Sequence, residues 1–298
     1  MKPPANNGAT ATGSALLTQN ADIQIDNSFK QPTKRQLPHG YTLQKNLVYT
    51  HVNGWKGHMD LHLPPKGDTP SPVILNIHGG GFIEGSKDMQ RGFGVFYSMG
   101  FTVANISYRL ANVAPAPAAI EDVHCAIAYL VQNAKELHID PTKIVTRGSS
   151  AGGHLALMGG LLCHTDSLVE NCSDTPVQIA AIVDICAPAN LTTWHAMKMG
   201  NKSSSSWLGA RKNDMDFVYS ISPIAHINKR SPPVFIAHGD ADATVPYEQS
   251  VALLQVLQEQ GVHAELYTVC GGGHDFSNRE RTQVNEAMCK FLKDVLNL

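Results

Sequence analysis

A serine, an aspartate and a histidine stand in three separate segments rich in small residues. Ser150 lies in Gly-Ser-Ser-Ala-Gly, Asp242 in His-Gly-Asp-Ala-Asp-Ala, and His274 in Gly-Gly-Gly-His-Asp-Phe. The first segment is a G-x-S-x-G motif, whose small residues permit a sharp turn that exposes the serine hydroxyl. A hydroxyl, an imidazole and a carboxylate together form the usual device for activating a serine. The pattern predicts Ser150 as nucleophile, His274 as its base, and Asp242 as the acid that orients the base.

Two aspartates compete for the acidic position, because Asp240 and Asp242 share one loop. We expect Asp242, which lies further into the loop and directly before the turn toward Val-Pro. Asp240 is expected to cap or stabilise the loop. A third aspartate, Asp122, is predicted to form a buried ion pair with Arg109 rather than a catalytic dyad.

Three consecutive glycines follow an apolar run in the segment His-Gly-Gly-Gly-Phe, residues 78–82. Such a backbone can approach a ligand closely and turn its N–H groups toward it. We expect the N–H groups of Gly80 and Gly81, with that of Ala151 beside the serine, to stabilise an oxyanion. A phosphate loop is the alternative, but no G-K-[ST] or G-x-G-x-x-G pattern accompanies the glycines. His78 is expected to be a structural hydrogen-bonding residue.

Each of these segments directly follows a short apolar run, typical of a buried strand. In a mostly parallel sheet, ligands bind beyond the carboxyl ends of the strands. Strands alternate with helical stretches, which predicts an α/β fold with a mostly parallel central sheet and helices on both faces. The expected strands are residues 43–50, 58–63, 72–77, 102–108, 143–147, 179–185, 233–237 and 264–269, and the expected helices are residues 117–137, 151–163, 247–260 and 278–296.

The remaining parts of the chain are an N-terminal stretch and an internal insert. Residues 1–40 are rich in Asn, Thr, Ala and Gln and are expected to form a flexible arm before a catalytic domain of residues 41–298. Residues 190–228 are expected to be an irregular, cap-like insert. Phe82, Trp194 and Trp207 are candidates for walls of the substrate pocket, and plain packing is an equal alternative for the two tryptophans.

Charge and hydropathy exclude several classes of function. Lys and Arg total 23 against 25 Asp and Glu in 298 residues, a net charge of −2. We therefore expect no nucleic-acid partner. No apolar run approaches the roughly 20 residues of a membrane helix, so no membrane span is expected.

The six cysteines show no spacing typical of a zinc site, and no metal is expected. Cys163 and Cys172 flank a polar stretch and either form a disulfide or remain two free thiols. The compartment therefore stays open between an extracellular or periplasmic and a cytoplasmic location. Oligomeric state cannot be inferred from these patterns.

Several motifs resemble the α/β-hydrolase esterases. HGGGF, SYRLA, PAPAAIEDV and GSSAGGHLA resemble the hormone-sensitive-lipase-like esterases, whereas HGDADATVPYEQS and GGGHDF resemble the BD-FAE-type esterases. The acid loop departs from the DPLxDE motif of the first group. Over roughly residues 41–298, the resemblance implies an α/β-hydrolase fold with the triad and oxyanion donors named above. Arg147 is a local departure, because an apolar or aromatic residue usually precedes the glycine there.

The resemblance implies a serine carboxylic ester hydrolase that acts through an acyl-enzyme. The BD-FAE branch is associated with carbohydrate acetyl and feruloyl esters, so the expected partner is a small-molecule or carbohydrate ester. This chemistry requires no metal or organic cofactor. An arylformamidase or amidase of the same architecture, and a non-catalytic binding protein on a hydrolase fold, are the alternatives.

Overall fold

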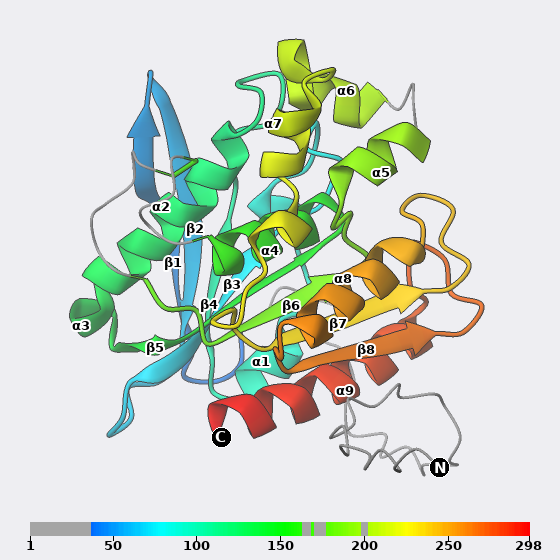
Figure 1. The fold of residues 1–298 in the computed structure, drawn as a ribbon. Helices are drawn as coiled ribbons and strands as arrows, with labels where there is room; N and C mark the ends of the chain where they lie inside the picture. Colours follow the sequence, from blue (N-terminus) through cyan, green and yellow to red (C-terminus); the bar gives the residue numbers. More distant parts are fainter. Residues whose placement is uncertain (1–36, 163–167, 170–176, 198–201) are drawn as a thin grey trace, which may run out of the picture.

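The computed structural model describes residues 37–162, 168–169, 177–197 and 202–298. In this part of the chain, eight strands form one sheet in the order β1-β2-β4-β3-β5-β6-β7-β8 (Figure 1). Strands β3 to β8 run parallel, and β2 is antiparallel to both of its neighbours. The strands are β1 (Thr42–Val52), β2 (Trp55–Leu63), β3 (Ser71–Ile77), β4 (Thr102–Ile106), β5 (Ile139–Ser149), β6 (Ala181–Ile185), β7 (Val234–Gly239) and β8 (Ala264–Val269).

Helices cover both faces of this sheet, because the inner strands are apolar on both sides. On β3, Val73 and Leu75 belong to the core under α2, α4 and α8, whereas Ile74 belongs to the core under α1 and α9. This alternation follows from the two-residue period of a strand. The helices are α1 (Gly94–Ser98), α2 (Ala118–Gln132), α3 (Ala134–Leu137), α4 (Ala151–Leu161), α8 (Glu248–Glu259) and α9 (Asn278–Leu296).

Two helices show how well local signals predict bounds. The expected helix 278–296 coincides with α9, whose start carries a capping box between Ser277 and Glu280. The expected helix 117–137 is instead divided at Asn133 into α2 and the short α3. The Asn133 side chain donates to Tyr129 O at the end of α2, which favours termination there. The single long helix was therefore wrong at its C-terminal end.

The insert at residues 190–228 is more regular than expected. It contains the short helices α5 (Leu191–Met197), α6 (Lys202–Leu208) and α7 (Met215–Ser220), with 3₁₀ turns η2 (Gly209–Arg211) and η3 (Pro223–His226). Figure 1 shows α5, α6 and α7 grouped on the side of the molecule opposite α9. Asp214 caps α7 by accepting a hydrogen bond from Phe217 N. The role of the insert as a cap over the site stays a prediction.

Some expectations fall outside the described residues. They concern the arm up to residue 36, and Cys163 and Cys172 with their disulfide. Among the described cysteines, Cys125 on α2 is disulfide-bonded, which the sequence analysis did not anticipate, and Cys186, Cys270 and Cys289 are free. No helix in the described ranges has the length and hydropathy of a membrane span.

Candidate active site

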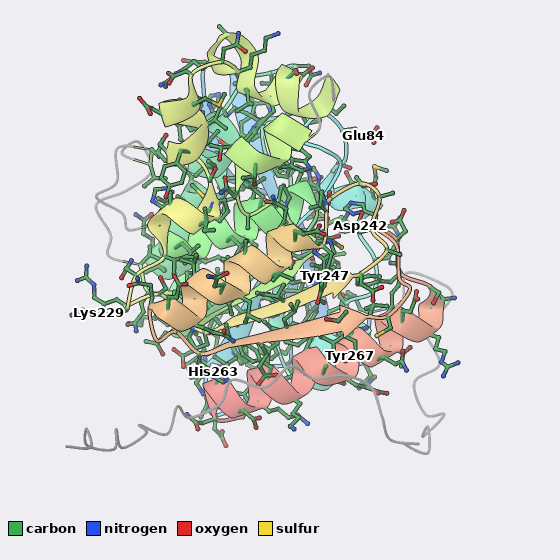
Figure 2. The ribbon with its side chains drawn as sticks, turned by 45° about the vertical axis from the view of Figure 1, so that its right-hand side comes forward. Glu84, Lys229, Asp242, Tyr247, His263 and Tyr267 are labelled. Carbon is green, nitrogen blue, oxygen red and sulfur yellow. The ribbon has the colours of Figure 1, made fainter. Side chains whose placement is uncertain are left out.

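The site residues gather at one end of the sheet. Figure 2 shows Asp242, which follows β7, and Glu84, which follows β3, at the same end of the molecule. Lys229 and His263, which precede β7 and β8, lie at the opposite end. The carboxyl ends of the parallel strands therefore meet where Asp242 lies, as expected for ligand sites in such sheets.

Ser150 occupies a strained turn between β5 and α4. Its backbone angles are φ 56° and ψ −124°, a conformation that costs a non-glycine residue about 1–3 kcal/mol. Backbone hydrogen bonds hold the turn: Ser150 N donates to Ile185 O at 2.8 Å, and Ser150 O accepts from His154 N at 3.0 Å. Gly152 permits the close approach, because a Cβ there would collide with Ile77 O. The G-x-S-x-G motif thus places Ser150 directly after the carboxyl end of β5.

Asp242 and His274, the residues predicted as acid and base, are hydrogen-bonded to each other. His274 Nδ1 donates to Asp242 Oδ2 at 2.6 Å, and the Asp242 side chain is fully buried. The other carboxylate oxygen, Oδ1, accepts from Thr244 N at 2.7 Å and Val245 N at 3.0 Å. Burial opposes ionisation, but hydrogen bonds from His238, His274 and these backbone groups hold the pKa of Asp242 well below its usual range. Asp242 is therefore a carboxylate at neutral pH.

The second aspartate of the loop has a structural contact. Asp240 is exposed, and its Oδ1 accepts a hydrogen bond from Gly271 N at 2.6 Å. Gly271 begins the glycine segment that leads to His274. Asp240 therefore ties the acid loop to the histidine loop, in keeping with the loop-stabilising role expected for it.

One pocket of about 390 Å³ joins the three predicted catalytic segments. Ser150 and His274 both line it, and His274 is 21% exposed, so its ring reaches the pocket. No hydrogen bond between Ser150 and His274 is present among the described residues, and such contacts in unliganded sites often tighten only around substrate. The lining residues are Gly79, Gly80, Gly81, Phe82, Glu84, Ser149, Ser150, Ala151, Pro188, Trp194, Thr244, Val245, His274 and Asp275.

The expected oxyanion donors line the same pocket. Gly80 (φ 114°) and Gly81 (φ 59°) adopt backbone angles that favour glycine. Among the described residues, the N–H groups of Gly80, Gly81 and Ala151 have no hydrogen-bond acceptor. Ala151 also begins α4, whose N-terminal dipole end favours negative charge. The three residues with these unused N–H donors therefore line the same pocket as Ser150.

Two of the three aromatic residues predicted to form the pocket wall line the pocket, and the third does not. Phe82 and Trp194 line it, whereas Trp207 is absent from its wall and fully buried. The Trp207 ring stacks on Phe82 with centroids 3.9 Å apart, and both rings meet His154 edge-on. Trp207 thus supports Phe82 from behind.

Comparison with known proteins shows the family to which this chain belongs. The BD-FAE family model matches residues 59–257, a range that includes Ser150 and Asp242 and ends before His274. The chain belongs to the BD-FAE family. It is 28% identical over 234 residues to esterase LipQ of Mycobacterium tuberculosis, covering 74% of this chain and 55% of LipQ. The chain thus spans about half the length of the curated relatives it matches.

Solved structures share the fold over most of the chain. A truncated carbohydrate esterase from gut microbiota has a TM-score of 0.75 and 29% identity, covering 88% of this chain and 99% of that one. An acetyl ester-xyloside bifunctional hydrolase from Caldicellulosiruptor lactoaceticus has a TM-score of 0.70 and 25% identity, covering 82% and 89%. The fold of this BD-FAE chain is that of the α/β-hydrolase esterases.

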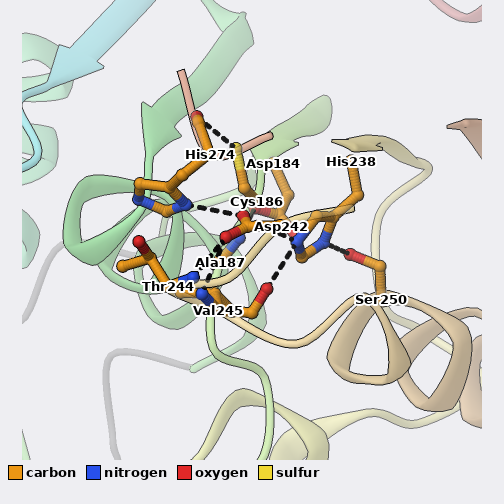
Figure 3. Close-up of polar contacts among 9 residues, drawn as sticks. All are labelled: Asp184, Cys186, Ala187, His238, Asp242, Thr244, Val245, Ser250 and His274. Atoms are coloured by element: carbon orange, nitrogen blue, oxygen red, sulfur yellow. Dashed lines mark hydrogen bonds and ion pairs between the residues drawn. The ribbon is translucent and has the colours of Figure 1, made fainter. Parts of the chain in front are cut away.

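The site contains polar residues that sequence reasoning did not assign. His238 and Asp184 are fully buried beside Asp242, and Cys186 Sγ lies 3.7 Å from His274 O (Figure 3). His238 lies in the motif that carried the family resemblance, directly before a glycine at the end of a strand. That position was the only signal for it. Its partners Asp242, Val245 and Ser250 lie within the next 12 residues, but their spacing alone does not show that the side chains meet.

Cys186, Asp242 and His274 offer three ligand-type atoms within 4.8 Å of one another. The Asp242–His274 separation of 2.6 Å is that of a hydrogen bond, whereas two oxygen or nitrogen ligands on one tetrahedral zinc lie about 3.3 Å apart. Burial also raises the pKa of the Cys186 thiol well above its usual value. The cluster therefore fits a hydrogen-bonded acid–base pair better than a metal site.

Arg147, where the sequence differs from the esterases it resembles, places a charged side chain on β5 shortly before the Ser150 turn. Its Nη1 donates to Asn76 Oδ1 at 2.6 Å, and the guanidinium lies 5.8 Å from the centroid of the Phe96 ring. Burial lowers the pKa of Arg147 to about 10. Phe96 belongs to the core under α1 and α9, so the Arg147 side chain lies on that side of the sheet, and it is not among the residues that line the pocket.

Proposed function

We propose that this chain is a serine carboxylic ester hydrolase that acts through an acyl-enzyme. The observation that carries the proposal is the buried Asp242–His274 hydrogen bond in a pocket shared with Ser150. The Asp242 carboxylate fixes the proton on Nδ1 of His274 and leaves Nε2 free to accept a proton. Esterase names among the relatives and structural neighbours agree with this chemistry.

In the acylation step, His274 Nε2 takes the proton of Ser150 while Oγ attacks the ester carbonyl carbon. The carbonyl oxygen becomes an oxyanion, and the N–H groups of Gly80, Gly81 and Ala151 stabilise it. The loss of one such donor typically costs about 10²–10³ in rate. The tetrahedral intermediate then collapses, the C–O bond to the alcohol breaks, and His274 returns the proton to the departing alkoxide.

In the deacylation step, water replaces the alcohol. His274 removes a proton from water, the hydroxide attacks the acyl carbon, and the bond to Ser150 Oγ breaks with return of the proton to the serine. Asp242 stays ionised throughout and stabilises the imidazolium that forms in each half. The acid product leaves, and the free enzyme is restored.

We infer short-chain acyl esters such as acetylated or feruloylated carbohydrates as substrates. A pocket of about 390 Å³ with Phe82 and Trp194 in its lining has room for a small acyl group. Two structural neighbours are named as a carbohydrate esterase and an acetyl ester-xyloside hydrolase. These names support the substrate class, and a rate comparison tests it.

The first experiment removes the nucleophile. Ser150→Ala is expected to abolish hydrolysis of p-nitrophenyl acetate and labelling by a fluorophosphonate, because both require Oγ. Ser98→Ala, at the end of α1, serves as a matched control and is expected to keep both. Circular dichroism shows that each variant is folded. Full turnover in folded Ser150→Ala would refute the proposed nucleophile.

The second experiment addresses the substrate. Initial rates are compared on acetylated xylan, methyl ferulate and p-nitrophenyl esters from acetate to laurate. We expect release of acetate or ferulate and a fall in kcat/KM as the alkyl acyl chain lengthens. Turnover of p-nitrophenyl acetate with neither carbohydrate acetyl nor feruloyl release would reject the substrate class and leave the esterase chemistry in place.

A further inference from the structure

Asp242 is held by two histidines on the same oxygen atom. His274 Nδ1 lies 2.6 Å from Asp242 Oδ2, and His238 Nε2 lies 3.1 Å from the same atom (Figure 3). His238 Nε2 is also 3.0 Å from Val245 O, and its Nδ1 is 2.6 Å from Ser250 Oγ. The triad chemistry uses only His274, so the second histidine needs its own explanation.

The partners of His238 determine where its proton lies. A backbone carbonyl only accepts hydrogen bonds, so the contact with Val245 O requires a proton on Nε2 of His238. In the neutral ring, Nδ1 is then an acceptor, and the Ser250 hydroxyl donates to it. In the charged ring, both nitrogens are donors. In either state Nε2–H is available to Asp242 Oδ2, so the contact does not depend on the charge of His238.

The anchoring of His238 makes it a rigid support. The side chain is fully buried in β7, and Ser250, also fully buried, belongs to α8. The Tyr247 ring packs against it edge-on, with centroids 5.7 Å apart. Asp242 itself lies in the loop after β7. His238 therefore links the loop that carries Asp242 to β7 and α8, two elements of the core.

We propose that His238 is a positioning residue that holds Asp242 Oδ2 in place to receive the proton of His274, with Ser250 fixing its tautomer. The inference rests on the proposed triad. Thr244 N and Val245 N hold only Oδ1. Without His238, the Oδ2 atom that faces His274 has no second donor, and the carboxyl group is free to rotate. Misplacement of a catalytic group by about 1 Å can cost about a hundredfold in rate.

Two substitutions of His238 distinguish the loss of its hydrogen-bond donor from the loss of its imidazole ring. His238→Leu removes the donor and is expected to lower kcat about 10–100-fold with little change in KM. His238→Gln places its amide nitrogen at the same number of bonds from Cβ as Nε2 and is expected to recover most of kcat. The rate of fluorophosphonate labelling falls in parallel with kcat, because it also depends on His274 acting on Ser150.

A double-mutant cycle tests whether His238 acts through Asp242. In an Asp242→Asn background, His238→Leu is expected to cause less than about a twofold further loss of kcat, because the group it positions is already altered. A purely structural histidine would lower kcat by the same factor in both backgrounds. That additive result, or wild-type kcat in folded His238→Leu, would overturn the inference.

Controls separate positioning from general destabilisation. His124→Leu on α2 removes another buried histidine, whose Nε2 contacts Met158 O, and is expected to lower thermal stability while kcat stays unchanged. If His238→Leu does not fold, Ser250→Ala takes its place, with an expected loss of about twofold to fivefold in kcat that vanishes in the Asp242→Asn background. Full activity of Ser150→Ala would refute the proposed function, whereas an inactive Ser150→Ala beside a fully active His238→Leu would reject only the positioning role.

Discussion

Asp184 and Asp242 (Figure 3) lie at neighbouring strands and both have fully buried side chains, but their pKa values are shifted in opposite directions. Asp242, after β7, accepts hydrogen bonds from His274, His238, Thr244 N and Val245 N. Asp184, within β6, accepts one from Ala187 N at 3.1 Å, and its Oδ2 has no partner in the described part of the chain. The pKa of Asp242 is well below its usual range, whereas burial raises that of Asp184 to about 7.

Burial raises the pKa of both carboxyl groups, and the hydrogen-bond donors around Asp242 outweigh that effect whereas the single donor to Asp184 does not. A loop has backbone N–H groups that no ladder uses, and Thr244 and Val245 turn theirs toward Asp242. Inside a sheet, most N–H groups already pair with the neighbouring strands, as around Asp184 in β6. Asp242 lies beyond the end of β7 and receives these free N–H groups, whereas Asp184 lies within β6 and does not.

The two groups also affect stability in opposite directions with pH. The depressed pKa of Asp242 favours the folded state above the unfolded pKa near about 3.9, and this gain is lost as pH falls. The raised pKa of Asp184 favours the protonated folded state below about pH 4. That gain is lost as pH rises toward about 7.

The largest effect is expected for Asp242→Asn. The amide can no longer stabilise the imidazolium form of His274, and in a related triad the corresponding change lowers kcat about 10⁴-fold, or about 5 kcal/mol. Asp184→Asn, the matched change on the neighbouring strand, is expected to keep kcat within about threefold. Steady-state kinetics on p-nitrophenyl acetate checks both. Equal losses in the two variants would remove the functional distinction between the aspartates.

An intermediate effect is expected on the stability of Asp184→Asn. The amide cannot ionise, so the variant avoids the cost of a buried charge that the wild type incurs as pH rises. From the raised pKa of about 7, the stability of the variant relative to wild type should increase by about 3 kcal/mol between pH 5 and pH 8. Urea unfolding of both proteins at each pH measures this. A relative stability that does not change with pH would contradict the raised pKa.

The smallest effect is expected for Asp240→Ala, in the same loop as Asp242. This change removes an exposed hydrogen bond to Gly271 N, worth about 1 kcal/mol. We expect a small loss of thermal stability and a fall in kcat of less than about threefold, because the His274 loop loses one tether. A loss of kcat near that of Asp242→Asn would show that the acid was assigned to the wrong member of the pair.

Local sequence patterns predicted much of the fold and the candidate site. The strand 264–269 and the helix 278–296 have the bounds of β8 and α9, because two-residue and 3.6-residue periodicities and a capping box are encoded within a few neighbouring residues. The buried Arg109–Asp122 pair is confirmed, with Nη2 and Oδ1 2.8 Å apart. The elbow at Ser150 followed likewise from five consecutive residues. In the insert, where no clear periodicity exists, the helices α5, α6 and α7 were missed.

The sequence by itself determined the types of the reacting groups and their places after strands, because each depends on the local backbone. Only the tertiary structure decided which groups touch. His238 reaches Asp242 and Ser250 because β7, its loop and α8 pack together, and Trp207 of the insert stacks on Phe82 of the glycine loop. The His238 contacts join residues at most 12 positions apart and depend on how the loop between β7 and α8 folds back on β7. The contact between Phe82 and Trp207 joins segments far apart in the chain, so no local pattern encodes it.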